Sequence, residues 1–367
     1  MGFGVYIHVP FCARRCDYCD FATWTDRHHL MEAYAAACVT DLRRRCDSGP
    51  VPPATSVFFG GGTPSLLPAD LLLAVLDAVP LAPGAEVTVE CNPDTVSPAL
   101  LAGYRSGGVN RLSFGVQSMA PHVLAALGRT HDPAGVERAI EAARGAGFDN
   151  FNVDLIYGAA GETLSDWCAT LDAALALDPP HVSAYALTVE PGTPLARRIG
   201  AGEVAAPDDD DQARKYLAGD AALPASGRPW YEISNWARPG RECRHNLLYW
   251  EQGEYLGIGC AAHGHSVVAS AGEGRPVGRR WWNVRTPDRY IDLIGQGASA
   301  EGGHEILVGA DREAEAAMLA LRTRGGVSST PRADRLVADG LAEPRDGRVV
   351  LTPTGRLLAN EATLRLL

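Results

Sequence analysis

The first half of the sequence alternates short runs of β-branched and apolar residues with longer segments of helical periodicity. The predicted strands are residues 5–9, 56–59, 86–89, 111–116, 150–156 and 181–189. The predicted helices are residues 30–45, 68–78, 97–103, 121–127, 133–146 and 163–177. Repeated β-α units form a parallel sheet with helices outside. Six units are too few for a complete eight-stranded barrel, so we predict an α/β fold with a partial (β/α)6 TIM-like barrel; a doubly wound sheet is the alternative.

Polar residues cluster at or beyond the ends of successive predicted strands, which favours the barrel. A glycine run at residues 60–63 follows the second strand, and Glu90 and Asn92 follow the third. Gln117 ends the fourth strand, and Asp154 lies in the fifth. Because the carboxyl ends of barrel strands converge on one mouth, we expect these side chains to surround one pocket.

Three cysteines lie in one loop after the first predicted strand, in the segment Cys12-Ala-Arg-Arg-Cys16-Asp-Tyr-Cys19. This spacing places three thiolates on one side of a turn, which suits three corners of a cuboidal iron–sulfur cluster. The fourth iron then has no ligand from the loop and can bind a small molecule. A zinc site is an alternative, because structural zinc takes four ligands and Cys243 and His245 could complete the set.

Composition narrows the class of protein. The chain has 367 residues and a net charge of −11, which argues against a general nucleic-acid-binding surface. The nine cysteines are odd in number, and the N-terminus lacks the basic and apolar regions of a signal peptide. No stretch of the sequence is long and apolar enough to span a bilayer. We therefore expect a cytoplasmic protein whose clustered cysteines bind metal.

The β-α repeat fades after about Ala205, and residues 230–283 are rich in aromatic side chains and glycine. The last part reads as helices followed by a hairpin with Asp346-Gly347 at its turn, which is typical of a winged-helix-like module. The acidic balance argues against DNA binding, so we expect this module to serve packing or a partner. The predicted division is a barrel at 1–225, a connecting segment that completes the core at 226–305, and the C-terminal domain at 306–367.

The segment Gly60-Gly-Gly-Thr-Pro64 is not a P-loop, because no Lys-Ser/Thr pair follows it. Glycines let a ligand approach the backbone closely, so free backbone groups there could bind the ammonium and carboxylate of an amino acid. Glu90, Gln117, Arg129 and Asp154 add carboxylates, an amide and a cation. Glu90 alone could instead be a salt-bridged surface residue, and the other three could likewise have a structural role. Together they suit a zwitterionic, sugar-bearing ligand.

The cysteine loop followed by Gly-Gly-Gly-Thr-Pro resembles the radical S-adenosylmethionine (SAM) superfamily and, within it, the oxygen-independent coproporphyrinogen oxidase-like proteins. The supporting motifs are Ile7-His-Val-Pro-Phe-Cys12, Phe59-Gly-Gly-Gly-Thr-Pro64, Glu90-Cys-Asn-Pro93, Phe114-Gly-Val-Gln-Ser118 and Asn152-Val-Asp-Leu-Ile-Tyr-Gly158. The resemblance implies a [4Fe-4S] cluster on Cys12, Cys16 and Cys19 whose open iron chelates SAM. One electron then cleaves SAM to methionine and a 5′-deoxyadenosyl radical.

The resemblance also implies which residues contact SAM, although it assigns no further catalytic residue. Tyr6, Gly61 and Glu90 match contacts to the cluster-bound SAM. Positions that contact a second SAM in the oxidase relatives are matched by Tyr18, Gly62, Thr63, Gln117, Arg129, Asp154 and Ala186.

Two further positions separate the branches of this family. Dehydrogenases carry a fourth cysteine two residues after the third, where this chain has Phe21, which cannot ligate iron or relay a hydrogen atom. The segments Tyr231-Glu-Ile-Ser-Asn-Trp236 and Cys243-Arg-His-Asn-Leu-Leu-Tyr-Trp250 resemble the haem chaperone branch, whose His-Asn-x-x-Tyr-Trp motif is associated with haem binding. An aromatic turn that packs the barrel against the tail is the alternative. The implied haem contacts are His245 with Asn246, Tyr249 and Trp250.

The resemblance therefore implies a haem chaperone or transfer protein that binds a [4Fe-4S] cluster, SAM and, as cargo, haem. Its expected partners are haem-accepting proteins, including membrane respiratory proteins met at the periphery, and an electron donor such as a flavodoxin or ferredoxin. A homodimer is a further expectation. Two alternatives are an oxygen-independent coproporphyrinogen III dehydrogenase and a two-SAM radical methyltransferase.

Overall fold

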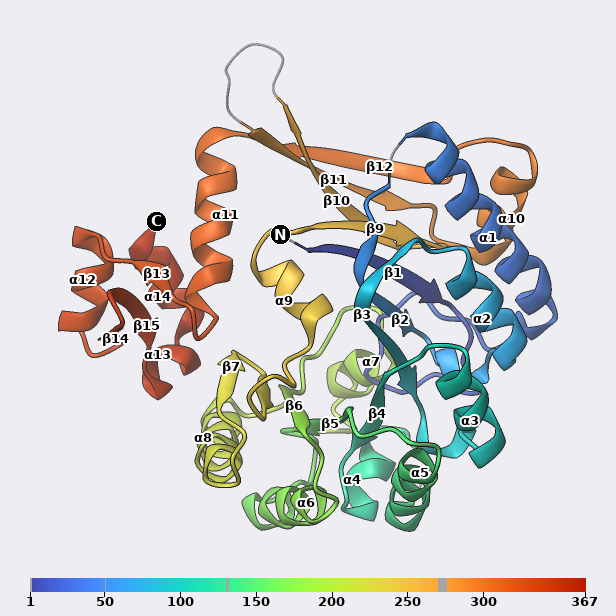
Figure 1. Ribbon diagram of the computed structural model, residues 1–367. Coiled ribbons are helices and arrows are strands. Elements are labelled where there is room, and N and C mark those ends of the chain that lie inside the picture. The colour runs from blue at the N-terminus through green and yellow to red at the C-terminus, as the bar shows by residue number, and fades with distance from the viewer. Residues whose placement is uncertain (1, 50, 130–131, 270–275) are drawn as a thin grey trace.

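The computed structural model describes residues 2–49, 51–129, 132–269 and 276–367. Its core is a sheet of six parallel strands that pair in the order of the sequence (Figure 1). These strands are β1 (Phe3–Val9), β2 (Ala54–Gly61), β3 (Leu81–Cys91), β4 (Arg111–Gln117), β5 (Phe151–Tyr157) and β6 (His181–Ala186). A doubly wound sheet reverses its strand order at a switch point, and β1–β6 show no reversal. The prediction of a partial barrel is confirmed.

The helices between these strands lie on the outside of the sheet (Figure 1). They are α1 (Met31–Ser48), α2 (Ala69–Asp77), α3 (Pro98–Ser106), α4 (Pro121–Ala126), α5 (Pro133–Gly145) and α6 (Leu164–Ala176). Several begin where the sequence supplies an N-cap. The side chains of Ser97, Asp132 and Thr163 accept backbone N–H groups of the first turns of α3, α5 and α6.

Alternation along the strands separates an apolar outer face from a more polar inner face. In β1, Val5, Ile7 and Val9 are buried in the core that packs on the helices. Tyr6 and His8 point the other way, into the barrel, because successive side chains of a strand face opposite sides. The chemistry-bearing side chains therefore lie inside the barrel.

The sheet continues beyond the six predicted strands on both sides. Strand β9 (Glu254–Ile258) pairs in parallel with β1, and three antiparallel strands follow it outward. These are β10 (His263–Ala269), β11 (Pro276–Asn283) and β12 (Glu301–Leu307). The other edge adds β8 (Asn235–Ala237) and β7 (Trp230–Glu232) next to β6. The sequence did not predict this extension. Three further helices are α7 (Pro194–Gly200), α8 (Asp209–Ala225) and α10 (Pro287–Gly295).

The C-terminal part has its own small apolar core, which includes Leu321, Leu336 and Val349. Helices surround a three-stranded antiparallel sheet, in agreement with the predicted helices and hairpin. They are α11 (Gly309–Leu321), α12 (Pro331–Ala338), α13 (Pro353–Leu357) and α14 (Ala359–Leu366), with β13 (Val327–Ser328), β14 (Ala342–Arg345) and β15 (Arg348–Leu351). Asp346 and Gly347 have φ of 49° and 76°, the positive pair that a type I′ turn requires. The two boundaries between the three predicted domains remain predictions.

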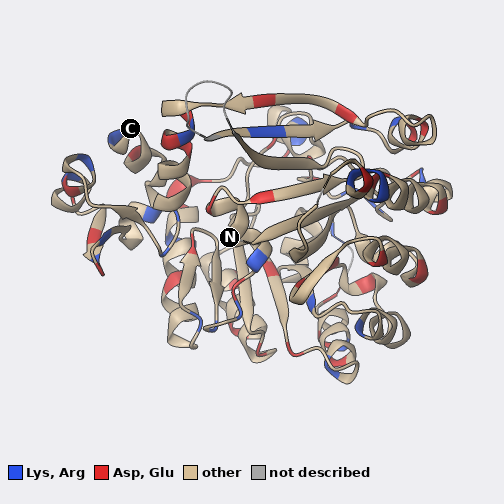
Figure 2. Cartoon of the chain, turned by 45° about the horizontal axis from the view of Figure 1, so that its top comes forward, with Lys and Arg blue, Asp and Glu red and all other residues tan. Residues whose placement is uncertain are grey.

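Charged residues of both signs are interspersed along the outer helices (Figure 2). Such a mixture of positive and negative side chains is typical of helix faces exposed to solvent, and the described outer helices carry no surface of one charge sign. Among the described helices, none combines the length and the apolar character needed to cross a bilayer.

Candidate functional site

The cysteine loop leaves β1 and lies at the carboxyl ends of the barrel strands. Backbone hydrogen bonds fix it: the Cys12 N–H donates to the Trp24 carbonyl (3.1 Å), and the Cys19 N–H donates to the Cys16 carbonyl (3.2 Å). Cys12 is buried, whereas Cys16 and Cys19 are half-buried. All three line one cavity of about 500 Å³. The loop therefore presents its thiols to a space inside the barrel mouth.

The glycine run after β2 packs directly against this loop. The Thr63 N–H donates to the Phe11 carbonyl (2.8 Å), and a Cβ at Gly62 would lie only 2.7 Å from that oxygen. Gly61 has φ of 109°, and a Cβ there would lie 2.4 Å from the His8 ring. Only glycine allows this backbone path. The same residues line the cavity, so their backbone groups face any ligand held there.

Two of the three sulfurs receive a polar donor from another loop. Thr63 Oγ1 lies 3.6 Å from Cys12 Sγ, and Arg129 Nη1 lies 3.6 Å from Cys16 Sγ. Arg129 is held by a second bond, from Nη2 to the Gly115 carbonyl (2.7 Å). Burial raises the pKa of Cys12, and the hydrogen bond from Thr63 opposes that shift.

The donor set fits a cluster better than a single zinc ion. Within the ranges that the structure describes, no three His, Cys, Asp or Glu side chains are grouped closely enough to hold one metal ion. His245 bonds to Ser56 and Tyr249 and takes no part in the cysteine loop. The zinc alternative that used Cys243 and His245 therefore has no site here. A cuboidal cluster takes its thiolates at separate corners, which matches three thiols around one cavity.

Two half-buried carboxyl groups face the same cavity. Glu90 Oε2 accepts the Gly61 N–H (3.1 Å), while Asp154 accepts from Ser113 Oγ and from Asn152 Nδ2, both at 2.8 Å. Burial, followed by the nearby Asp154 charge, raises the pKa of Glu90 to about 8. Burial also raises the pKa of Asp154. A bound cation would favour the ionised forms, so the pair suits an ammonium or sulfonium ligand.

The structure brings together nearly all residues that the resemblance had marked for SAM. The cavity is lined by Tyr18, Gly61, Gly62, Thr63, Glu90, Gln117, Arg129, Asp154 and Ala186. Tyr6 is not among the lining residues. Its ring packs against those of Phe58 and His245, and its hydroxyl is 3.1 Å from His8 Nδ1. A direct SAM contact through the Tyr6 side chain is therefore not formed in this conformation.

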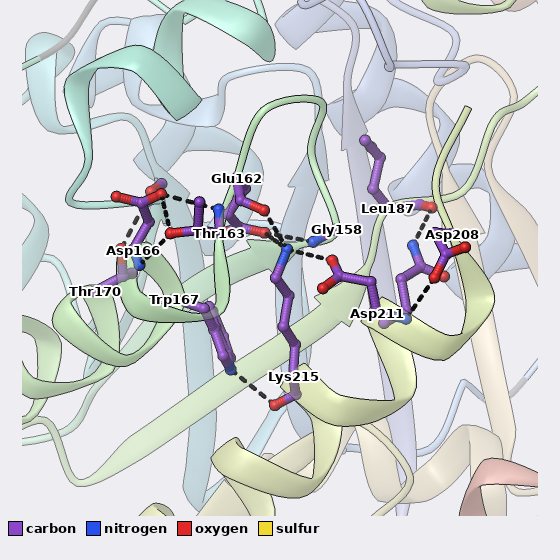
Figure 3. A network of polar contacts seen from close by, with 12 residues as sticks. Gly158, Glu162, Thr163, Asp166, Trp167, Thr170, Leu187, Asp208, Asp211 and Lys215 are labelled. Atoms are coloured by element: carbon purple, nitrogen blue, oxygen red, sulfur yellow. Dashed lines mark hydrogen bonds and ion pairs between the residues drawn. The ribbon is translucent and has the colours of Figure 1, made fainter. Parts of the chain in front are cut away.

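A buried ion-pair network anchors one wall of the cavity (Figure 3). Lys215 Nζ on α8 lies 3.1 Å from Glu162 Oε2 and 2.6 Å from Asp211 Oδ2. The next residue along α8 from Asp211, Gln212, donates to the carbonyl of Leu187 (2.9 Å), which lines the cavity. Loss of one partner of a buried pair costs about 3–5 kcal/mol, so the network holds α8 firmly against the loops after β5 and β6.

Helix α9 (Arg244–Trp250) carries the predicted haem motif and packs on the amino ends of β1 and β2 (Figure 1). His245 is only 1% exposed. Its Nδ1 is 3.0 Å from Ser56 Oγ and its Nε2 is 2.8 Å from the Tyr249 hydroxyl, while its ring stacks on Phe58. Burial lowers the pKa of His245 to about 3, so the ring is neutral.

The other residues of the motif also serve the packing of α9. Asn246 Nδ2 donates to Glu232 Oε1 (2.8 Å), Tyr249 packs edge-on against Tyr255 at 4.7 Å between centroids, and Trp250 is half-buried. Both His245 nitrogens are occupied, so in this conformation neither is free for a haem iron. In this conformation α9 packs on β1 and β2, and a haem contact of this segment stays a prediction.

Comparison with known proteins shows which family the chain belongs to. The model of the radical SAM superfamily matches residues 6–174. The heme chaperone HemW of Mycobacterium tuberculosis is 43% identical, over 100% of this chain and 95% of the relative. The heme chaperone HemW of Bacillus subtilis is 34% identical, over 97% of each chain.

The chain belongs to the HemW family of radical SAM proteins. Membership of the radical SAM superfamily implies a [4Fe-4S] cluster and SAM as cofactors. Among solved structures, coproporphyrinogen III oxidase (HemN) from Escherichia coli, a radical SAM enzyme, covers 100% of this chain and 90% of its own, with a TM-score of 0.83 and 22% identity. At that identity the likeness shows the shared fold.

Sequence reasoning missed several residues that line the cavity of this HemW-family protein. Ser113 belongs to them, and it shares the inward face of β4 with Gly115 and Gln117. Successive side chains of a strand point to opposite faces, so counting back from Gln117 in steps of two residues would have identified Ser113. Thr188 and Glu190 also line the cavity, but they lie in an irregular loop beyond β6, where no periodic signal exists.

Proposed function

We propose that this HemW-family protein is a haem chaperone: it binds haem as cargo and hands it to haem-accepting proteins. The observation that carries the proposal is the 43% identity to a heme chaperone HemW across the whole chain. The similarity includes the barrel mouth, α9 and the C-terminal part alike, because it spans 100% of this chain.

The barrel mouth is the proposed cofactor site. Cys12, Cys16 and Cys19 would hold a [4Fe-4S] cluster, and the backbone of Gly61 with the Glu90 carboxylate would hold the amino acid part of SAM. The remaining lining residues would contact that SAM or a second one; they are Tyr18, Gly62, Thr63, Gln117, Arg129, Asp154 and Ala186. When bound, the cluster would supply the one-electron reduction that cleaves SAM.

Phe21 argues against coproporphyrinogen dehydrogenation as the reaction at this site. It lines the cavity and is 58% exposed, at the position where dehydrogenases of this family carry a fourth cysteine. A phenyl ring has neither a metal ligand nor a transferable hydrogen of the kind a thiol offers. The same scaffold can thus hold the cofactors without the group that the oxidation requires.

Haem ligation by His245 requires that α9 leaves the barrel base. One imidazole nitrogen would have to give up its partner, Ser56 or Tyr249, before it could reach iron. The finer features of the proposal rest on the family resemblance. They are a cytoplasmic location, haem-accepting respiratory proteins as partners, a flavodoxin or ferredoxin as electron donor, and a homodimer.

An anaerobic haem titration of the reconstituted protein tests the proposal. We expect a saturable Soret band with a stoichiometry of one haem per chain at most. Absence of any saturable Soret change would overturn the chaperone function.

A second assay addresses the alternatives. Incubation of the same protein with coproporphyrinogen III, SAM and a reductant should give no protoporphyrinogen, because Phe21 replaces the fourth cysteine. Appreciable turnover would establish the dehydrogenase, and a methylated product would establish the methyltransferase.

A further inference from the structure

A row of polar side chains inside the barrel connects the cavity with α9. It begins at Asp154 on β5 and continues through Asn152 on the same strand to His181 on β6 and Tyr231 on β7. Asn152, His181 and Tyr231 are each at most 3% exposed. None of these three lines the cavity, so any effect on a ligand there must pass through Asp154, which does. We call these four residues the Asp154–Tyr231 row.

The hydrogen bonds at the cavity end of the row can run in only one direction. Asn152 Nδ2 lies 2.8 Å from Asp154 Oδ1 and 2.7 Å from Ser113 Oγ, and Ser113 Oγ donates to Asp154 Oδ2 (2.8 Å). An ionised carboxylate only accepts hydrogen bonds, so the amide of Asn152 must turn its Nδ2 toward Asp154. The Oδ1 of Asn152 then faces His181 Nδ1 at 2.6 Å and needs a donor there.

The direction at the α9 end of the row follows independently. The Tyr231 hydroxyl accepts the backbone N–H of Cys243 and the Nδ2 of Asn246, both at 3.4 Å. A backbone N–H can only donate, so the hydroxyl gives its own proton to His181 Nε2, which is 2.8 Å away. Burial, and then the nearby Arg111 guanidinium, lowers the pKa of His181 well below its ordinary value, so the ring is neutral.

Both ends of the row therefore require the same tautomer of His181. A neutral imidazole carries one N–H, and here it must be Nδ1–H, which donates to Asn152 while Nε2 accepts from Tyr231. With the opposite tautomer, His181 Nδ1 and Asn152 Oδ1 would face each other as two acceptors, which favours rotation of the amide. The rotated amide would turn its carbonyl toward the Asp154 carboxylate and repel it.

We propose that His181 is a positioning residue of the SAM site: through Asn152 it holds the Asp154 carboxylate as an acceptor toward the cavity. The inference rests on the proposed function, which assigns SAM to this cavity. A carboxylate has about four lone-pair sites, so Asp154 can bond Asn152 and Ser113 and still accept an ammonium or hydroxyl group of the ligand. Because Tyr231 is bonded to α9, the helix with the haem motif helps to fix the tautomer.

The test compares two variants of His181 that differ only in polar atoms. Asparagine and leucine have nearly the same shape, so His181→Asn and His181→Leu leave the same space, and both lose the bond to Tyr231. Only asparagine can still donate to Asn152 Oδ1, because its Nδ2 takes the place of the histidine Nδ1. Tyr231→Phe removes the hydroxyl alone. Its matched control is Tyr290→Phe, at a buried tyrosine outside the row whose hydroxyl bonds Asp41 (2.9 Å).

SAM affinity is measured by equilibrium dialysis on the reconstituted full-length proteins, at matched cluster absorbance. His181→Leu should weaken SAM binding by about tenfold, because Asn152 loses its donor and Asp154 its orientation. His181→Asn should stay within about twofold of the unmodified protein, although both variants lower the midpoint of chemical denaturation. Tyr231→Phe should weaken binding by about threefold, and Tyr290→Phe should leave it unchanged. A merely structural role would make the affinity follow the denaturation midpoint instead of the donor.

The tautomer is tested directly on the unmodified full-length protein, with no need for a variant that folds. In long-range proton–nitrogen correlation spectra at neutral pH, His181 should show a protonated Nδ1 and an unprotonated Nε2. The signals are assigned by their absence in His181→Asn. A protonated Nε2 would overturn the inference.

The binding results separate the inference from the function on which it rests. If the unmodified protein binds SAM and His181→Leu binds it equally tightly, or His181→Asn is as weak as His181→Leu, then His181 does not position Asp154 through its Nδ1 donor. The proposed function stands in both cases. If the unmodified reconstituted protein binds no SAM, the proposed cofactor site fails together with the inference.

Discussion

The cysteine loop lines an open cavity of about 500 Å³ at the carboxyl end of the barrel, whereas His245 at the amino end is 1% exposed and bonded at both ring nitrogens. Both regions were marked by short motifs of metal-ligating and aromatic residues. At the mouth, the polar groups are turned toward a space that a ligand can fill. At the base, the polar groups hold α9 against β1 and β2. The contrast teaches that a motif identifies chemistry, while the pairing of its atoms decides whether that chemistry is offered to a ligand.

The pKa shifts also differ between the barrel mouth and the barrel base. At the mouth, burial and then the nearby Asp154 charge raise the pKa of Glu90 to about 8. At the base, burial lowers the pKa of His245 to about 3, because the charged ring would lose its contact with water. Each shift gives a measurable pH dependence, of opposite sign.

The largest expected effect concerns the mouth. Cys16→Ser should abolish the absorbance of the [4Fe-4S] cluster after reconstitution, and with it SAM binding by equilibrium dialysis, since only two thiolates remain. The free energy of unfolding of the apoprotein should change by less than about 0.5 kcal/mol, because Cys16 is half-buried. Cys168→Ser, at an exposed cysteine on α6, is the control. Retention of the cluster in Cys16→Ser would show that the loop is not its ligand.

The next effect concerns the base. His245→Ala should lower the free energy of unfolding by about 2–4 kcal/mol, because it leaves a cavity and removes the partner of Ser56. His304→Ala, at a histidine whose side chain is 51% exposed, should change it by less than about 0.5 kcal/mol. Chemical denaturation of both variants without cofactors measures the difference. Equal stability of the two would contradict the buried packing role of His245.

A smaller effect is the pH dependence from Glu90. Its pKa is 4.5 in the unfolded chain and about 8 when folded, so the folded state binds more protons between these values. The stability of the apoprotein should therefore decline as pH rises from 4.5 to 8, and Glu90→Gln should remove that decline. We expect a contribution of about 1–2 kcal/mol at pH 8, below the full shift because the side chain faces a wet cavity.

Thermal unfolding of the unmodified protein and of Glu90→Gln across this pH range is the measurement. His245 acts in the opposite direction. It stays neutral in the folded state but takes up a proton below pH 6.5 in the unfolded chain, so it lowers stability as pH falls. Parallel pH profiles for the unmodified protein and Glu90→Gln would contradict the raised pKa.

The smallest effect belongs to Phe21. Because its side chain is 58% exposed, Phe21→Ala should change the free energy of unfolding by less than about 0.5 kcal/mol. Cluster absorbance and SAM affinity should also stay unchanged, since a phenyl ring makes no bond to iron. Loss of the cluster in Phe21→Ala would show that the ring shields it, which would sharpen the account of the mouth.

The six β-α units were predictable because each depends on local apolar periodicity. The errors occur where local signals fail. Strand β3 begins at Leu81, earlier than predicted. The prediction started later because Pro83 and Gly84 are residues typical of turns and rare inside strands. Strand β6 ends at Ala186 because the chain leaves the sheet to form the cavity wall.

Non-local pairing explains what could not be predicted. Strand β9 (Glu254–Ile258) pairs with β1 (Phe3–Val9) although the two are far apart in the sequence, and no local pattern predicts that pairing. The burial of His245 depends on Ser56, 189 residues away. The cysteine loop was predictable because all three thiols lie within one turn of chain.

Direct handover of haem tests the central claim most directly. Haem-loaded protein is mixed anaerobically with increasing amounts of an apo haem protein whose holo form has a distinct Soret maximum. A chaperone should transfer haem at a rate that rises with acceptor concentration, because transfer occurs within a complex of the two proteins. A rate that is independent of acceptor concentration, and equal to the rate of spontaneous haem loss, would contradict the account.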